Sequence, residues 1–515
     1  MSIRSRKIFS LSVAVACLHF FPLVANAAAP ASAYDRIVVS GFESIPTFYV
    51  ARGGNNANPG TRASPWKTIK YAVGASSPAP AGSIIYVAPG TYTDQVTVAK
   101  DGISLIGYKT DPGDQPSVLA NVPIDMTNTH PFPIFDPAEM PLLDQGNRAS
   151  GFAFMVQGRQ NLTIRNFNIR NFAYGISAGN SNRNFAENLS IENVNISTVG
   201  DTNASYSGLG IALGSMSTSF SNGSYVRNAL IINVAAEGFK ISGDNNVVQN
   251  IRVYSTEKDG YASTDYYVMV TGSYNVVSDS LIWRWPFSAH SGHGFTIKDN
   301  ADQLSGGPLI KPMHNLFRNN VAINMGEGYV VRHRGVQQNT FLDNAAYGTY
   351  PGFGNCGNGN GIVIRDGASA NLFKNTTIAN TCNAIVIGDS IEDGGALETP
   401  PFDNTIDNAR INTTYVGVGY LRDNPSVPNS DAGNNLITGS SFVLARYMFY
   451  AEHPSKQMHY ANTLFSGVAD VDNEGYFRGY NQDDPNGAVY MNDIIRSQFD
   501  NCVFEKFPGG MPVGW

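Results

Sequence analysis

A short apolar–polar pattern that starts near an Asn and reaches a second Asn or Asp within six residues returns throughout the chain. Its mean spacing is about 30 residues, and a period of roughly 20 to 50 residues with short β runs is typical of a solenoid. Asn side chains in such a column can bond to each other and to turn backbone from one coil to the next. The repeat therefore predicts an all-β chain folded as a right-handed parallel β-helix. Copies begin near Asn161, Asn188, Ser224, Asn246, Asn275, Asn315, Asn339, Asn371 and Asn404, with looser copies near Asn435 and Asn462. The shared polar column is Asn166, Asn193, Asn228, Asn250, Asp279, Asn319, Asp343, Asn375 and Asn408.

A second predicted strand precedes six of these copies, and its residues alternate between two faces. The inward positions are large and apolar, as in Phe295 and Ile297 or Tyr329 and Val331. The outward positions form two columns. The first outward column reads Lys240, Met269, Thr296, Val330, Val363, Val386, and the second reads Ser242, Thr271, Lys298, Arg332, Arg365, Gly388.

The repeat also sets the domain boundaries. A chain of 515 residues suggests three or four domains by length alone, but a solenoid grows by copy number, so we expect one. Residues 48–469 are assigned to the β-helix with its N-terminal cap and loop insertions, and residues 28–47 to a linker. Residues 470–515 lack the pattern and are expected to form a C-terminal cap.

Residues 1–27 are typical of a secretory signal. Arg4, Arg6 and Lys7 precede an apolar stretch, and Ala25-Asn26-Ala27 supplies a small-x-small cleavage site. A membrane anchor is the alternative, although the apolar stretch is short for one. We expect a secreted or periplasmic protein without a membrane span.

The composition excludes several classes of protein. Charged residues are only 15% of the chain, with 42% hydrophobic residues and 11% aromatics, which argues against disorder and coiled coils. The formal net charge is -7, and removal of three basic residues with the signal makes it -10, which disfavours nucleic acid as a partner. We expect a monomer.

The segment from Phe48 to Tyr92 includes a predicted short helix. Ser64 is its expected N-cap and Pro65 its first residue, with Trp66, Ile69 and Val73 on one face that would cover the open end of the solenoid. With the repeats, this segment resembles the pectate-lyase-like β-helix superfamily, including polysaccharide lyases of the chondroitinase B and alginate lyase type. The resemblance extends from about Phe48 to Asn462 and implies the fold more specifically than the activity.

Lys298, Arg332 and Arg365 form a basic stripe on three consecutive turns. Like charges about 5 Å apart repel, so an anionic ligand or protein carboxylates must offset them. Asp299, Asp366 and Asp389 follow the stripe by one residue and are candidates, while the functional alternative is a groove for an acidic polysaccharide.

β-Elimination of a uronic acid polymer needs neutralisation of the sugar carboxylate, a base for the C5 proton and an acid for the leaving oxygen. Cationic neighbours make a Lys easier to deprotonate, so Lys298 is a reasonable base. The resembling lyases use a Lys base and an Arg acid on neighbouring turns, which implies these roles for Lys298 and Arg332. No clear Asn/Glu/Glu calcium set precedes them, and Arg365 or His333 is expected to neutralise the substrate instead.

Histidines and tyrosines lie near the stripe in sequence. His293 and His333 are further catalytic candidates, because a His/Tyr pair is a second way to move protons in an elimination. The predicted substrate-binding residues are Arg365, Lys240, His290, Tyr266 and Arg334.

Three alternatives remain open from the sequence. Gly292-His293-Gly294 resembles a motif of polygalacturonase-type hydrolases, which need paired carboxyl groups, and a C5-epimerase needs the same proton abstraction as a lyase. A non-catalytic carbohydrate-binding or surface β-helix is the third.

No cofactor is required by these patterns, although Ca²⁺ is possible. Asp470, Asp472 and Glu474 resemble the start of a calcium loop, but its twelfth position is Asn481.

The cysteines leave one question open. Cys356 and Cys382 precede adjacent copies of one strand at similar offsets, so they are either a disulfide or two free thiols.

Overall fold

A computed structural model describes the chain in a series of segments. They are residues 44–119, 134–178, 186–201, 208–215, 219–256, 264–285, 292–299, 311–348, 359–389, 401–422, 433–445, 447–451, 458–467, 477–479 and 498–505. The predicted signal peptide, His290, Cys356 and the possible calcium ligands Asp470, Asp472 and Glu474 lie outside them. Within these segments no helix has the length and hydropathy needed to cross a bilayer.

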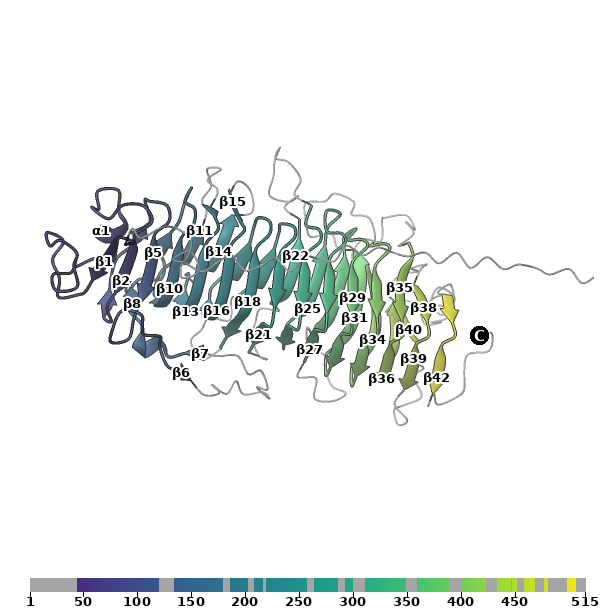
Figure 1. Cartoon of the computed structure of the whole chain (residues 1–515). Coiled ribbons are helices and arrows are strands. Elements are labelled where there is room, and N and C mark those ends of the chain that lie inside the picture. The colour runs from purple at the N-terminus through teal and green to yellow at the C-terminus, as the bar shows by residue number, and fades with distance from the viewer. Residues whose placement is uncertain are drawn as a thin grey trace, which may run out of the picture.

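The described chain is a right-handed parallel β-helix, as the repeat predicts. Successive turns stack in an elongated solenoid with the N-terminal strands at one end and the C-terminal strands at the other (Figure 1). Each complete turn adds one strand to sheet B and two strand runs to sheet A. Sheet B consists mainly of β4 (Val96–Thr97), β9 (Phe152–Met155), β11 (Tyr174–Ala178), β14 (Leu209–Ser215), β17 (Glu237–Ile241), β19 (Tyr266–Val270), β22 (His293–Lys298), β25 (Glu327–Arg332), β28 (Asn360–Arg365), β31 (Asn383–Asp389), β34 (Val416–Arg422), β37 (Tyr447–Ala451) and β40 (Phe477–Gly479).

Sheet A carries the repeat motif. Its strands are β1 (Thr47–Val50), β2 (Ile84–Val87), β3 (Thr91–Tyr92), β5 (Ser104–Gly107), β8 (Leu142–Asp144), β10 (Thr163–Arg170), β13 (Ser190–Val199), β16 (Tyr225–Val234), β18 (Val247–Ser255), β20 (Val276–Ser278), β21 (Leu281–Arg284), β23 (Leu316–Arg318), β24 (Val321–Ile323), β26 (Thr340–Leu342), β27 (Ala345–Tyr347), β29 (Leu372–Lys374), β30 (Thr377–Ala379), β32 (Thr405–Asp407), β33 (Arg410–Asn412), β35 (Asn435–Thr438), β36 (Ser441–Ala445), β38 (Met458–Ala461), β39 (Leu464–Gly467), β41 (Gln498–Asp500) and β42 (Val503–Glu505). A short hairpin, β6 (Val118–Leu119) with β7 (Ile134–Phe135), is antiparallel.

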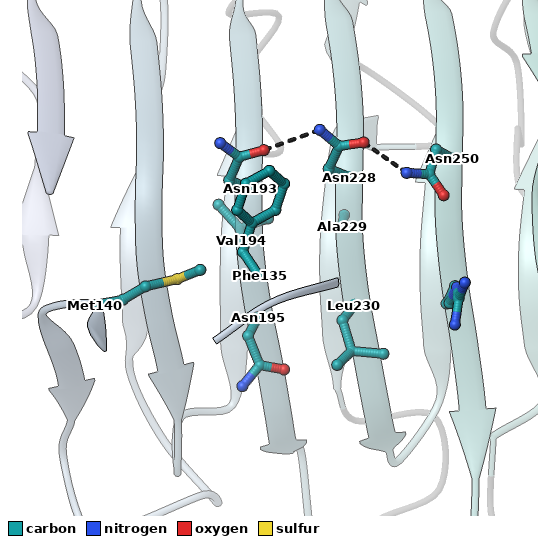
Figure 2. A pocket seen from close by; sticks show the side chains of 10 residues that line it. Phe135, Met140, Asn193, Val194, Asn195, Asn228, Ala229, Leu230 and Asn250 are labelled. Atoms are coloured by element: carbon teal, nitrogen blue, oxygen red, sulfur yellow. Dashed lines mark hydrogen bonds between the residues drawn. The ribbon is translucent and has the colours of Figure 1, made fainter. Parts of the chain in front are cut away.

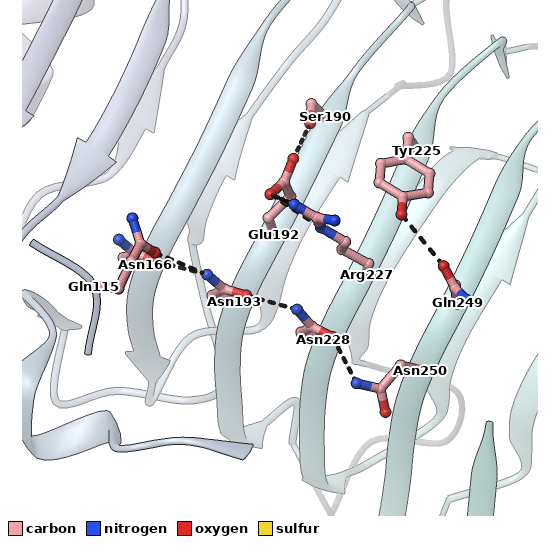
Figure 3. Close-up of polar contacts among 10 residues, drawn as sticks. All are labelled: Gln115, Asn166, Ser190, Glu192, Asn193, Tyr225, Arg227, Asn228, Gln249 and Asn250. Carbon is pink, nitrogen blue, oxygen red and sulfur yellow. Dashed lines mark hydrogen bonds and ion pairs between the residues drawn. The ribbon is translucent and has the colours of Figure 1, made fainter. Parts of the chain in front are cut away.

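The predicted polar column lies at the corner between the two runs of sheet A. All nine of its residues have a positive φ, between 52° and 63°, a conformation that Asn and Asp tolerate better than other residues with a side chain. Each Asn amide can also donate to the preceding turn: Asn193 Nδ2 lies 2.9 Å from Asn166 Oδ1, and Asn228 Nδ2 lies 2.9 Å from Asn193 Oδ1 (Figure 3). Asn250 extends this corner ladder. The corner therefore selects Asn for both backbone and side-chain reasons.

A second asparagine ladder is buried inside the solenoid. Its residues are Asn246, Asn275, Asn315, Asn339, Asn371, Asn404 and Asn435, each no more than 1% exposed. The backbone N–H and the Nδ2 of each one donate to the Oδ1 of the next, as Asn315 does to Asn339 at 3.0 and 2.8 Å. This buried ladder satisfies polar groups that have no access to water and fixes the register between turns.

The core consists of the predicted inward residues. Aromatic rings stack along it, with Phe295 5.4 Å from Tyr329 and Phe341 4.4 Å from Phe373 between ring centroids. All twelve inward positions predicted for the six sheet B strands are 3% exposed or less.

The N-terminal helix differs from the prediction. The helix α1 (Ile69–Val73) begins after Thr68, whose Oγ1 accepts the Tyr71 N–H, so Ser64 is not the N-cap. Trp66 is extended and bridges Val50 in parallel, which withdraws it from the helix. Trp66, Ile69 and Val73 are nevertheless fully buried, and α1 lies beside β1 at the N-terminal end (Figure 1).

The solenoid continues past the predicted boundary at residue 469. Strands β40, β41 and β42 pair in parallel with β37, β38 and β39. The segment from 470 therefore contributes further strands to both sheets, rather than a cap alone.

We predict that Asn339→Ala destabilises the protein by about 2–3 kcal/mol, because the buried N–H groups of Asn315 lose their acceptor. Asn319→Gly, at an exposed corner position with φ 54°, is the matched control and costs about 1 kcal/mol or less. Urea denaturation of both variants checks this, and equal losses would contradict a special role for the buried ladder.

Candidate functional site

The basic stripe has the alignment that the sequence predicts. In sheet B, Lys298 of β22 lies opposite Arg332 of β25, and Arg332 lies opposite Arg365 of β28. The three cations therefore occupy one outward column on three consecutive turns.

A further outward column lies at the start of the same strands and was not recognised from the sequence. It contains Glu237, Tyr266, His293, Glu327, Asn360 and Asn383 in register. Most of these residues precede a glycine, such as Gly294, where a Cβ would lie 2.3 Å from the Gly328 carbonyl oxygen. The repeated polar residue before glycine is the sequence signal for Glu327, since it aligns Glu327 with His293 on the next turn.

Side chains of the two columns meet. The Tyr266 ring stacks on the His293 ring with centroids 4.7 Å apart, and Lys298 Nζ lies 5.5 Å from the centroid of the Tyr266 ring. Three groups able to transfer protons therefore converge from β19 and β22.

Two carboxylates offset part of the positive charge. Glu327 Oε2 lies 2.5 Å from His293 Nδ1, and Glu327 Oε1 lies 3.6 Å from Arg365 Nη2. Asp366 lies 3.6 Å from Arg365 Nε and 3.9 Å from Arg332 Nε, as expected for a neutralising residue.

The other two expected carboxylates behave differently from Asp366. Asp299 accepts the backbone N–H of Gly335 at 3.0 Å, and the Asp389 side chain lies outside the described part. We call the residues Tyr266, His293, Lys298, Glu327, Arg332, Arg365 and Asp366 the sheet B cluster.

Arg365 has unused hydrogen-bonding capacity. Its ion pairs at 3.6 Å are longer than hydrogen bonds, and its Nε and Nη2 are buried without a hydrogen-bond partner in the described chain. These two nitrogens form the edge of a guanidinium that binds a carboxylate through two parallel hydrogen bonds.

His333 lies behind Arg332 rather than in an open site. Its Nε2 accepts a hydrogen bond from Arg332 Nε at 3.0 Å, which requires an unprotonated Nε2, and the residue is 1% exposed with φ 80°. This contact orients the Arg332 guanidinium. A direct catalytic role for His333 is therefore less favoured than for His293.

The side chains of the sheet B cluster differ in exposure. Arg332 and Lys298 are 3% and 7% exposed, whereas the side chains of His293 and the adjacent Asp265 are 18% and 30% exposed. Asp265 Oδ1 lies 3.7 Å from His293 Nε2.

The surroundings shift the pKa values of Tyr266 and Glu327 in opposite directions. Burial raises the pKa of the Tyr266 hydroxyl, and Asp265 and Glu327 add to this against the opposing effect of Arg332. Burial also tends to raise the pKa of Glu327, but Arg365 and His293 outweigh it and lower that pKa to about 2. At neutral pH Tyr266 keeps its proton and Glu327 is ionised.

Two predicted binding residues lie apart from the sheet B cluster. Lys240 pairs with Glu237 at 3.0 Å, and Met269 separates it from Thr296 in its column. Arg334 is exposed beyond the end of β25.

Among the described residues, no group of three His, Cys, Asp or Glu side chains is arranged to hold a metal ion. Cys382 is disulfide-bonded, and its pairing with Cys356 stays a prediction.

A separate small cavity of about 10 Å³ lies on the outer face of sheet A. Phe135 lies over Asn193 and Val194 there, and Met140 lies on the N-terminal side (Figure 2). None of the predicted site residues lines it. It is bounded by the corner ladder at Asn193, Asn228 and Asn250, and by Leu230 and Arg252.

The family model that matches part of the chain has no assigned activity. Residues 52–258, less than half of the chain, match a family model described as DUF1565, a protein of unknown function. No curated protein matches the chain.

Among solved structures, the alginate lyase AlyF-OU02 is 13% identical with a TM-score of 0.49, over 91% of this chain and 97% of that one. The A-module of the mannuronan C-5 epimerase AlgE6 from Azotobacter vinelandii is 12% identical with a TM-score of 0.37, over 84% and 91%. A GH87 α-1,3-glucanase catalytic domain is 14% identical with a TM-score of 0.39, over 91% of this chain and 66% of that domain.

We predict that Glu327→Gln lowers stability at neutral pH by about 3 kcal/mol, because a folded-state pKa of about 2 against an ordinary 4.5 stabilises the native state. This stabilisation is complete above pH 4.5 and is lost as the pH falls towards 2. Urea denaturation of both proteins across this range checks it. A difference in unfolding free energy that stays constant down to pH 2 would contradict the prediction.

Proposed function

We propose that the chain is an exported carbohydrate-active enzyme that cleaves a uronic-acid-containing polysaccharide by β-elimination, with the sheet B cluster as its active site. The observation that carries this proposal is the gathering of three proton-transfer groups near Arg365, whose buried Nε and Nη2 make no hydrogen bond within the described chain. The export rests on the predicted signal at residues 1–27, and the sequence resemblance to polysaccharide lyases points the same way.

The sheet B cluster brings three cations together on consecutive turns. Lys298, Arg332 and Arg365 share one outward column, with Glu327 and Asp366 beside Arg365. A uronate carboxylate would bind among these cations. This binding would withdraw charge from the sugar, which makes the C5 proton easier to remove.

Proton transfer can be assigned to neighbouring side chains. Lys298 and His293 are the two candidate bases for the C5 proton, and Tyr266 stacks on His293 with a hydroxyl that keeps its proton at neutral pH. Its position next to His293 makes Tyr266 the candidate acid for the leaving oxygen, a role that the family resemblance assigns to Arg332.

Hydrolysis is favoured less by this geometry. A glycoside hydrolase needs one carboxyl group that stays protonated as the general acid. Glu327 is instead ionised at neutral pH, since Arg365 and His293 lower its pKa to about 2. A C5-epimerase shares the proton abstraction, and only the product distinguishes it from a lyase.

A panel of alginate, pectate, glucuronan and glycosaminoglycans tests the proposal. We expect one of them to yield the ultraviolet absorbance of an unsaturated uronate. Inversion at C5 without chain cleavage, seen by NMR, would indicate an epimerase. No unsaturated product, no new reducing ends and no inversion on any polymer would contradict an enzymatic function.

We predict that Lys298→Ala lowers kcat by about 10²-fold or more on the polymer that is cleaved, because it removes a cation beside Tyr266 and a candidate base. Lys374→Ala is the control, since Lys374 is exposed on sheet A and pairs with Asp407. Steady-state kinetics checks both, and full activity of Lys298→Ala would exclude a catalytic role for Lys298.

We predict that Arg365→Lys raises KM by about 10- to 100-fold, because a lysine keeps the charge but loses the two-pronged carboxylate contact. Arg410→Lys, on sheet A, is the control and should bind substrate normally. An unchanged KM for Arg365→Lys would show that Arg365 does not bind the uronate carboxylate.

A further inference from the structure

We propose that Glu327 is a positioning residue that holds the Nδ1 proton of His293 and so presents the Nε2 lone pair as the base for the C5 proton. This inference rests on the proposed function. It chooses between the two candidate bases, and it gives a role to a residue that sequence reasoning did not single out.

The contacts of His293 leave one arrangement favoured. Nδ1 faces Glu327 Oε2 at 2.5 Å, and an ionised carboxylate only accepts hydrogen bonds, so Nδ1 must carry the proton. In neutral His293 the lone pair then lies on Nε2, on the side of the ring that faces Asp265. The stacked Tyr266 ring also fixes the plane of the His293 imidazole.

The surroundings also favour the charged product of proton transfer. After Nε2 takes the C5 proton, the imidazolium lies between Glu327 and Asp265, whose Oδ1 is 3.7 Å from Nε2. The other charged or titratable groups that face this pair are Tyr266, Lys298, Arg332, Arg365 and Asp366.

Lys298 is less suited to the same step. Its ammonium lies over the face of the Tyr266 ring, and an aromatic face attracts a cation rather than a neutral amine. Lys298 then serves by stabilising the negative charge that develops on the substrate carboxylate.

The elimination balances with the groups present. The C5–H electrons form the C4–C5 double bond, the C4–O bond breaks, and its electron pair leaves with the oxygen. The C5 proton goes to His293 Nε2, and the leaving oxygen takes a proton from the Tyr266 hydroxyl. Water exchange then returns the proton of His293 to the tyrosinate.

Glu327 acts here without touching the substrate. One oxygen of the Glu327 carboxylate contacts His293 Nδ1, and the other faces Arg365 Nη2 at 3.6 Å. Arg365 thereby links the carboxylate-binding edge to the orientation of the base.

Imidazole ¹⁵N NMR of the full chain tests the tautomer without any substrate. His293 is assigned by comparison with His293→Ala, and we expect Nδ1 protonated and Nε2 bare at high pH. The opposite tautomer in the wild type would overturn the proposal, even if no Glu327 variant folds.

Kinetics of Glu327→Gln tests the consequence. We expect kcat to fall about 10- to 10³-fold with KM changed less than threefold, because the glutamine amide can donate to Nδ1 and favour the wrong tautomer. Loss of the carboxylate charge should also move the acidic limb of kcat/KM to lower pH, since the imidazolium is less stabilised.

Glu237→Gln is the matched control, because Glu237 lies in the same outward column, three turns from Glu327 and two from His293, and pairs with Lys240. It should match the wild type in kcat and pH profile. An unchanged tautomer and pH profile in Glu327→Gln would overturn the positioning role. Absence of turnover on every polymer would instead overturn the proposed function, while the NMR result still decides the tautomer.

Discussion

A buried amide that must find a partner governs the stacking of this solenoid. Each interior residue of the buried ladder, such as Asn315, receives two hydrogen bonds from the Asn of the turn before and gives two to the Asn of the turn after. A slip of one residue would leave these groups unpaired where water cannot reach them. The ladder therefore sets the register, and the register decides which outward side chains of sheet B face each other from turn to turn.

The sheet B cluster is a product of that register. Lys298, Arg332 and Arg365 become neighbours although more than thirty residues separate each from the next, because all three end equivalent strands. Glu327 and His293 become neighbours at the other end of the same strands. A rigid stack holds these groups together while the connecting segments vary in length, which explains how irregular spacing and a defined site coexist.

The fold and the basic stripe were predictable because both follow from alternation and repeat. The Arg365–Glu327 contact was not, since side-chain reach across two columns cannot be read from a one-dimensional pattern. The start of α1 was predicted wrongly because the bridge between Trp66 and Val50 outweighs local capping preference. The solenoid boundary at 469 was wrong because β41 and β42 keep the pairing after a long break in the pattern.

The two asparagine ladders run with opposite polarity. Amides of the buried ladder donate towards the C-terminal end, as Asn339 does to Asn371, whereas those of the corner ladder donate towards the N-terminal end, as Asn228 does to Asn193. Rows of aligned amides carry dipoles that add along their length. Because the rows oppose each other, their amide dipoles offset each other in part along the solenoid axis. A turn that carries an Asn in both rows therefore adds less net side-chain dipole to the stack than a turn with one row alone.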